Sequence, residues 1–98
     1  MTTATVLVIS SPRPEKGEGV EKYAASVRAL FKEAGMTPTL RAPVVLTLAG
    51  DSKPATVLTL NFPDVETAQA FFNQPAYQNL VPLRDDSFQR MEIHILKH

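Results

Sequence analysis

Arg84 is the residue in this sequence whose chemistry and position best fit a binding site. It follows an apolar helical stretch and precedes Asp85 and Asp86. The planar guanidinium group of an arginine can hold a carboxylate or an enolate through parallel hydrogen bonds. The same position fits an ion pair with a neighbouring aspartate, which is a common and weak surface interaction. Arg84 is therefore a candidate for ligand binding or catalysis, with a structural ion pair as the alternative.

Three further polar residues are candidates for the same ligand site. Tyr77 either presents its hydroxyl at the rim of a cleft or packs its ring over the turn at Pro75. Arg41 lies in a strand interrupted by prolines; it either reaches a pocket or a partner subunit, or is an edge charge that discourages strand pairing. Asn61 needs hydrogen-bond partners if it is buried, and a pocket or a dimer interface would supply them.

His94 is the candidate proton shuttle of the chain. Its unperturbed pKa of about 6.5 suits proton transfer near neutral pH. It alternates with Arg90 and Glu92 along the sequence, which is also the pattern of a solvent-exposed strand face. His94 is therefore either a catalytic residue or an exposed residue of the strand without a role in catalysis.

Composition excludes several classes of function. Ten basic and ten acidic residues cancel, so neither nucleic acid nor a membrane surface is expected as a partner. The chain contains no cysteine, which removes thiolate chemistry and disulfides. No spacing of histidines and carboxylates fits a metal, and no glycine-rich phosphate loop follows a strand. Without a leader or an apolar run of spanning length, we expect a cytoplasmic protein that needs no metal and no cofactor.

The hydrophobic pattern predicts one domain over residues 1–98 with the order β-α-β-β-α-β. Strands are predicted at residues 4–10, 37–49, 55–62 and 90–97, and a polar loop at residues 12–19. Residues 20–34 carry one apolar stripe at helical spacing, and Gly35 is placed to end that helix. Asp64 is a good cap for the other helix, and Pro75 separates it from a second short one.

This order is the ferredoxin-like pattern of an α+β domain. It predicts a four-stranded antiparallel sheet with both helices on one face. The second strand then lies at an edge, where Pro38 and Pro43 are tolerated because no ladder hydrogen bond is needed from them.

Apolar residues on both faces of the predicted strands indicate a partner for the face without helices. Val6 and Val8 oppose Leu7 and Ile9, and Val44, Leu46 and Leu48 oppose Val45. Each large apolar side chain left in water forgoes about 1.5–3 kcal/mol of burial. Roughly six of them would equal the whole stability of a small domain. We therefore predict a homodimer packed sheet to sheet.

The stretch at residues 58–84, LTLNFPDVETAQAFFNQPAYQNLVPLR, resembles the DUF1330 family. The residues that carry the resemblance are Phe62-Pro63, Asp64, Glu66, Phe71-Phe72, Asn73-Gln74-Pro75-Ala76-Tyr77 and Arg84, with Tyr23, Gly35 and Arg41 upstream. The resemblance covers residues 20–96. Met36 stands where the family often has a second glycine, and the loop before the first helix looks longer than usual.

The resemblance implies a dimeric α+β barrel, the fold class that includes cofactor-independent monooxygenases, muconolactone-isomerase-like enzymes and non-catalytic ligand binders. It does not supply a reaction, because fold alone is a poor guide to function. We expect a small organic ligand, either anionic or neutral, between the sheet and the helices. Isomerisation and cofactor-free oxidation are the candidate reactions. The alternative is a non-enzymatic interaction module whose polar residues only stabilise the homodimer.

Overall fold

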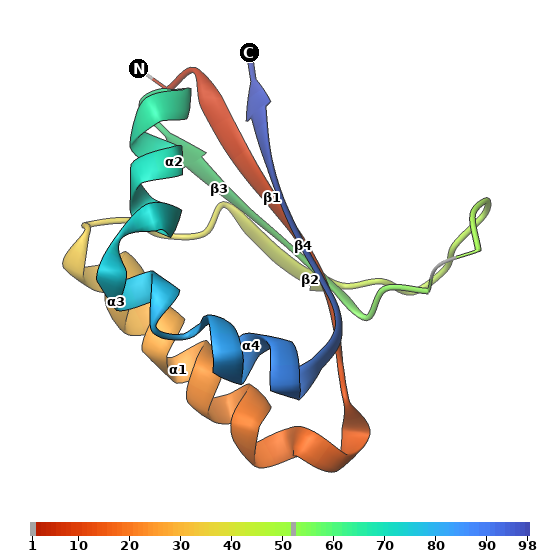
Figure 1. The fold of residues 1–98 in the computed structure, drawn as a ribbon. Helices are drawn as coiled ribbons and strands as arrows, with labels where there is room; N and C mark the ends of the chain where they lie inside the picture. Colours follow the sequence, from red (N-terminus) through yellow and green to blue (C-terminus); the bar gives the residue numbers. More distant parts are fainter. Residues whose placement is uncertain (1, 52) are drawn as a thin grey trace.

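A computed structural model of the chain describes residues 2–51 and 53–98 (Figure 1). Its elements are β1 (Ala4–Pro12), a 3-10 turn η1 (Pro14–Lys16), α1 (Gly17–Glu33), β2 (Leu40–Pro43), β3 (Thr56–Phe62), α2 (Val65–Asn73), α3 (Pro75–Gln78), α4 (Val81–Ser87) and β4 (Phe88–Lys97). The four strands form one antiparallel sheet in the order β2-β3-β1-β4. The predicted ferredoxin-like α+β fold is confirmed, with β2 at an edge.

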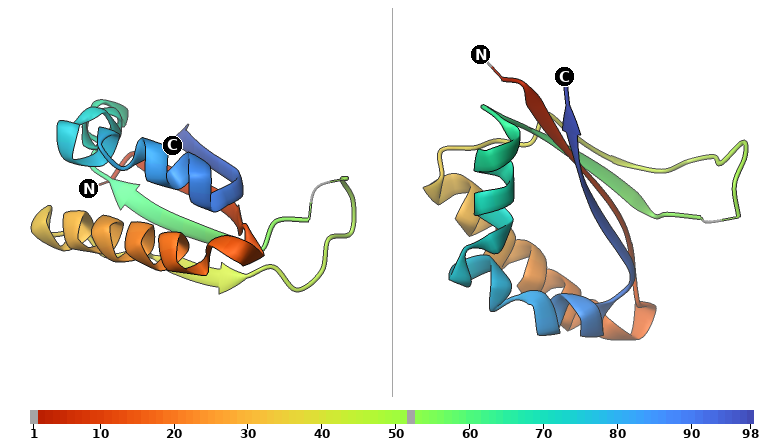
Figure 2. Two further views of the ribbon diagram at one scale, coloured as in Figure 1. Left: turned by 60° about the horizontal axis from the view of Figure 1, so that its bottom comes forward. Right: turned by 45° about the horizontal axis from the view of Figure 1, so that its top comes forward.

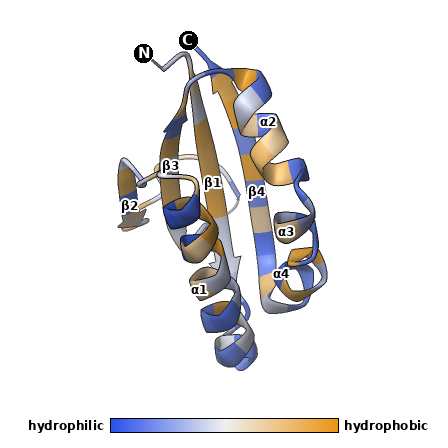
Figure 3. Ribbon diagram, turned by 90° about the vertical axis from the view of Figure 1, so that its left-hand side faces the viewer, coloured by the Kyte–Doolittle hydropathy of each residue, from blue (hydrophilic) through white to orange (hydrophobic). Residues whose placement is uncertain are grey.

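Strand register divides the side chains of the sheet between two faces. Val6 pairs with Leu60 on one side and with Ile95 on the other, so these three side chains share a face. The helices all lie on that side of the sheet, which we call the inner face (Figure 1). In Figure 3, which faces the helix layer, hydrophobic stretches of β1 and β3 lie behind and between the helices.

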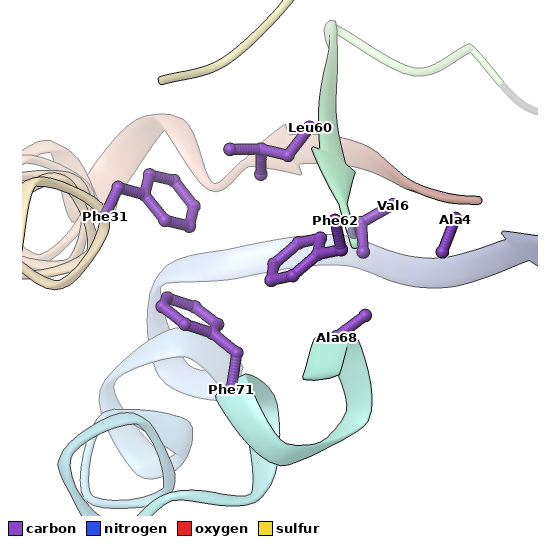
Figure 4. Close-up of a cluster of buried hydrophobic side chains, with 7 residues drawn as sticks. All are labelled: Ala4, Val6, Phe31, Leu60, Phe62, Ala68 and Phe71. Carbon is purple, nitrogen blue, oxygen red and sulfur yellow. The ribbon is translucent and has the colours of Figure 1, made fainter. Parts of the chain in front are cut away.

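The core lies where α1 and α2 meet the inner face. Val6, Leu60 and Phe62 have no solvent exposure. They pack with Ala4, Phe31, Ala68 and Phe71 in one cluster (Figure 4). The rings of Phe31 and Phe71 stack with their centroids 5.4 Å apart, which joins the two helices above the sheet.

Two helix boundaries form as the sequence predicts. The carboxylate of Asp64 accepts a hydrogen bond from the Thr67 backbone N–H at 2.7 Å, which caps α2. That hydrogen bond also lowers the pKa of Asp64, because it favours the charged form. Gly35 follows α1 with φ of 73°, the left-handed conformation that glycine adopts without steric cost.

The segment after Pro75 forms two short helices rather than the single one predicted. Pro75 begins α3, and Pro82 lies in the first turn of α4. A continuous helix would need an N–H at Pro82 to bond the Gln78 carbonyl, and proline has none. The chain therefore turns at Asn79 and Leu80 before α4 begins.

The first helix begins earlier than predicted. Residues 12–19 were expected to form a loop, but Pro14 starts η1 and α1 begins at Gly17. Proline is pre-organised for a first helical position, which explains how this polar segment becomes helical. The absence of a side chain at Gly19 lets α1 pack closely against α4, because a Cβ atom there would lie 2.3 Å from the Ser87 hydroxyl oxygen.

The second strand is much shorter than predicted. The sequence predicted a strand at residues 37–49, but β2 ends at Pro43. Residues 44–51, which we call the arm, extend from the sheet on the side opposite the helices (Figures 1 and 2). The sequence predicted Val44, Leu46 and Leu48 on one face of this strand and Val45 on the other. That prediction is wrong, because these residues follow the end of β2.

The outer face of the sheet, on the side without helices, mixes apolar and polar side chains. Leu7, Ile9 and Val57 are half-buried there. Leu40 and Leu96 lie on the same face and are 52% and 47% exposed. The prediction that β1 is apolar on both faces agrees with this arrangement. The protein thus carries apolar side chains on an outer surface that its own helices do not cover.

Candidate functional site

A cavity of about 180 Å³, which we call the inner cavity, lies between α1 and the inner face of the sheet. Its walls are mainly aliphatic and aromatic and come from the four strands, α1 and α2. The main apolar lining residues are Val8, Leu58, Ile93, Val27, Phe31 and Phe72. Such a mostly apolar recess suits the body of a small organic molecule.

Positive charge borders the entrance to the inner cavity. Arg28 and Arg41 line both the inner cavity and an adjoining open hollow, which Lys32 also borders. No aspartate or glutamate belongs to either lining. Across residues 2–51 and 53–98, no carboxylate lies within ion-pair distance of any of these three cations. Their charges are available to an anionic ligand.

Arg41 reaches this entrance because of the register of β2. It pairs with Leu58 of β3, and Leu58 points to the inner face, so Arg41 lies on the same face. The edge position of β2, expected from Pro38 and Pro43, leaves the arginine exposed beside the cavity.

Arg84 and Tyr77 lie together at a different place. The Nη1 atom of Arg84 donates to the Tyr77 hydroxyl at 3.1 Å, and its Nε donates to the Asp85 carboxylate at 3.1 Å. Arg84 and Tyr77 border a separate pocket of about 260 Å³ over α2, α3 and β4. Asn73 and Gln78 also line this pocket. We call it the α3 pocket. The structure thus contains the ion pair with Asp85 that the sequence offered as the alternative for Arg84.

Tyr23 links this group to the inner cavity, and sequence reasoning did not identify it as a polar site residue. Its hydroxyl lies 2.8 Å from the hydroxyl of Tyr77 in a buried contact. Its side chain also lines the inner cavity. Burial raises the pKa of Tyr23, and the hydrogen bond to Tyr77 raises it further, so the phenol stays neutral. A tyrosine within a buried helical stripe needs a hydroxyl partner, and that requirement was the available signal.

Asn61 and His94 lie on the outer face of the sheet, away from both pockets. Asn61 pairs with Thr5 in the register, and its Oδ1 accepts a hydrogen bond from the Thr5 hydroxyl at 2.9 Å. The Nε2 atom of His94 lies 2.9 Å from a carboxylate oxygen of Glu92. This contact and the one with Arg90 lower the pKa of Glu92. The sheet separates these two candidates from Arg41, Tyr77 and Arg84.

The inner cavity offers binding groups rather than groups that transfer protons. Its polar lining consists of Ser10, Thr56, Tyr23, Arg28 and Arg41. Neither a carboxylate nor an imidazole is among its lining residues. In the described part of the chain, no three or more histidine, aspartate or glutamate side chains gather in a group that could hold a metal ion. The structure describes no helix with the length and apolar character needed to span a membrane.

Comparison with known proteins identifies the family. The model of the domain of unknown function DUF1330 matches residues 5–98, nearly the whole chain. The chain belongs to the DUF1330 family. The resemblance seen in the sequence is confirmed and extends through β1. No curated protein matches the sequence.

Solved structures of other proteins share the fold at low sequence identity. A protein of unknown function from Rhodopseudomonas palustris is 21% identical with a TM-score of 0.74, over 99% of this chain and 82% of that one. A dimeric ferredoxin-like protein of unknown function from Jannaschia sp. is 16% identical, with a TM-score of 0.75 over 98% and 99% of the two chains. A dimeric protein of ferredoxin-like fold from Bacteroides fragilis is 11% identical, with a TM-score of 0.65 over 98% and 96%.

Proposed function

We propose that this DUF1330 protein binds a small, single-ring aromatic carboxylate in the inner cavity. The observation that carries the proposal is an apolar cavity bordered by Arg28 and Arg41, with Lys32 at the adjoining hollow, and none of the three has a carboxylate within ion-pair distance among the described residues. An apolar cavity of about 150 Å³ in another protein is known to hold benzene. A cavity of about 180 Å³ therefore has the size for one aromatic ring.

The charged end of the ligand belongs at the entrance in this proposal. Arg41 and Arg28 border the inner cavity from opposite walls, one from the sheet and one from α1. A guanidinium group pairs with a carboxylate through two hydrogen bonds, and each bond to a charged group contributes about 1.5–3 kcal/mol. Lys32 adds a third positive charge next to them. The ring then lies among the apolar walls and the carboxylate faces solvent and arginine.

We propose binding without a reaction as the function of this cavity. Isomerisation or cofactor-free oxidation needs a group that accepts a proton from the ligand. The titratable phenol at the inner cavity is Tyr23, whose pKa is raised by burial and which already bonds Tyr77. Arg84 and Tyr77 act in this proposal as positioning residues that hold Tyr23 in the cavity wall.

Calorimetric titration of the protein with benzoate and with its neutral isostere benzamide tests the proposal. Benzoate is expected to bind the wild type at least about tenfold more tightly than benzamide, because the carboxylate gains the arginine contacts. Arg41→Gln is expected to weaken benzoate binding by about tenfold or more, whereas the affinity for benzamide stays the same.

Two variants serve as controls in that titration. Lys22→Gln removes one positive charge from the exposed side of α1 and is expected to leave binding unchanged. Arg84→Gln removes the arginine of the α3 pocket. A loss of benzoate binding in Arg84→Gln with normal binding in Arg41→Gln would move the ligand to the α3 pocket. Absence of benzoate binding to the wild type would remove the ligand proposal altogether.

The functional unit that we infer is a homodimer packed through the outer face of the sheet. The apolar residues Leu7, Ile9 and Val57 on that face and the dimeric neighbours of the same fold support it. Sedimentation velocity at micromolar concentration should show a dimer, and Thr59→Lys, which places a charge in mid-sheet, should convert it to a monomer. A wild type that sediments as a monomer would contradict this inference.

The second candidate function is a non-enzymatic interaction module without a small ligand. The observation in its favour is that Arg84 is held by Tyr77 and Asp85 within the chain. A dimer that gives no heat with benzoate and no rise in melting temperature with other small carboxylates would support this module.

A further inference from the structure

The arm presents apolar side chains that the described parts of its own chain leave largely exposed. Val45, Leu46 and Leu48 are 92%, 73% and 91% exposed. Residues 42–50 contain no charged side chain. An extended, uncharged segment of this kind is a site for association, because each large apolar side chain gains about 1.5–3 kcal/mol when it is covered.

The base of the arm is fixed to the sheet, so its direction is set by the fold. The Val44 N–H donates to the Ala55 carbonyl at 2.9 Å, and the Ala55 N–H donates to the Ser10 carbonyl at 3.0 Å. The Ser11 hydroxyl also accepts from the Ala55 N–H, at 3.1 Å. From this base the arm extends away from the helix layer, as both views in Figure 2 show. The hydrophobic core lies on the inner face of the sheet, so the arm cannot pack against the core of its own chain.

The apolar surface of the arm continues that of the outer face. Leu40 and Ala42 of β2 lie on the outer face beside Val57, and the arm begins directly after β2. A second copy placed against the outer face would therefore lie on the side toward which the arm extends. Two-fold symmetry then brings each arm to the flank of the other copy.

We propose that the arm packs against a second copy of this chain through Val45, Leu46 and Leu48. The proposal rests on the homodimer inferred above and adds to it a segment outside the sheet. Asp51 at the end of the arm and Lys53 after it carry opposite charges, so the segment has no cluster of positive charge to favour an anionic membrane surface. The apolar, uncharged composition of residues 42–50 therefore favours contact with a second copy of the chain.

A fluorescent label on the arm tests the contact directly. Because the chain contains no cysteine, Thr47→Cys gives a single attachment site for an environment-sensitive dye and keeps all three apolar residues. Dilution from micromolar to nanomolar protein is expected to shift the emission toward that of the dye in water as the dimer dissociates. The same dye at Ala25→Cys, on the exposed side of α1, is expected to show no shift.

Charge substitutions separate the arm from the sheet face. The double variant Leu46→Asp, Leu48→Asp is expected to weaken dimerisation by about tenfold or more in sedimentation equilibrium, because the charges would have to leave water. Ala25→Asp adds a charge of the same sign on α1 and should leave the dimer intact. Melting curves of the diluted monomers show whether each variant folds.

The outcomes distinguish this proposal from the homodimer itself. If Thr59→Lys yields monomers while the arm variant dimerises as the wild type does, the arm proposal is overturned and the sheet-face dimer stands. If the wild type is a monomer, both fail. A label that responds to vesicles of phosphatidylcholine and phosphatidylserine but not to dilution would assign the arm to a membrane instead and would overturn the proposal.

Discussion

At the scale of single residues, the arginines of this protein differ in their hydrogen-bond partners. Arg84 is held by Tyr77 and Asp85, whereas Arg41 has no carboxylate within ion-pair distance in the described residues. The sequence indicated both as candidates, because residue type and spacing are alike for a structural and a ligand-binding arginine. What separates them is the direction of each side chain, which depends on strand register for Arg41 and on α4 for Arg84.

The buried phenol of Tyr23 predicts a loss of stability in alkali. Its folded-state pKa is raised above the unfolded value of about 10, so its contribution to stability is complete below that pH and is lost as the pH rises further. We expect the free energy of unfolding in urea to fall as the pH rises through about 10 and above, and to fall less in Tyr23→Phe. At neutral pH the variant should lose about 0.5–1.5 kcal/mol with the Tyr77 hydrogen bond.

An equal alkaline loss in Tyr23→Phe and the wild type would contradict this account. The phenolate absorbance of the wild type provides an independent measurement. The part of this absorbance that Tyr23→Phe lacks should appear only as the wild type unfolds.

At the scale of elements, the packing of α1 on α4 depends on a single glycine. A Cβ atom at Gly19 would lie 2.3 Å from the Ser87 hydroxyl oxygen, and Ser87 is fully buried. The side chain of a buried serine has little room to move away. The helices would therefore have to separate to admit a methyl group.

Gly19→Ala is expected to lower the free energy of unfolding by about 1–3 kcal/mol, the usual cost of overpacking. Gly17→Ala is the matched variant at the start of the same helix. No atom lies within 4 Å of the Cβ position there, so this substitution should be neutral or slightly stabilising. Equal urea midpoints for the two variants would show that the close approach has no energetic effect.

The arm shows where prediction of elements from sequence fails. Residues 37–49 have the composition of a strand, but β2 ends at Pro43, and the Val44 N–H makes the last backbone hydrogen bond of this segment, to the Ala55 carbonyl. An apolar segment has the same composition whether its own sheet or another molecule covers it. The sequence therefore predicted a strand for a segment that leaves the sheet.

At the scale of the whole molecule, the fold was the most predictable property. The change from strand to helix periodicity, the cap at Asp64 and the prolines near β2 all agree with one topology, and such agreement is typical of natural sequences. The inner cavity was not predictable in position, because it depends on how far α1 diverges from the sheet. Nothing in the spacing of Tyr23 and Arg28 along α1 specifies that distance.

An NMR titration of the isotope-labelled protein with benzoate shows where the ligand binds. We expect saturable shifts of amide signals around Val27, Phe31, Arg41 and Leu58, with much weaker changes at the same protein concentration when benzamide replaces benzoate. Shifts that gather instead around Asn73, Gln78 and Arg84, or the absence of saturable shifts anywhere, would contradict this expectation.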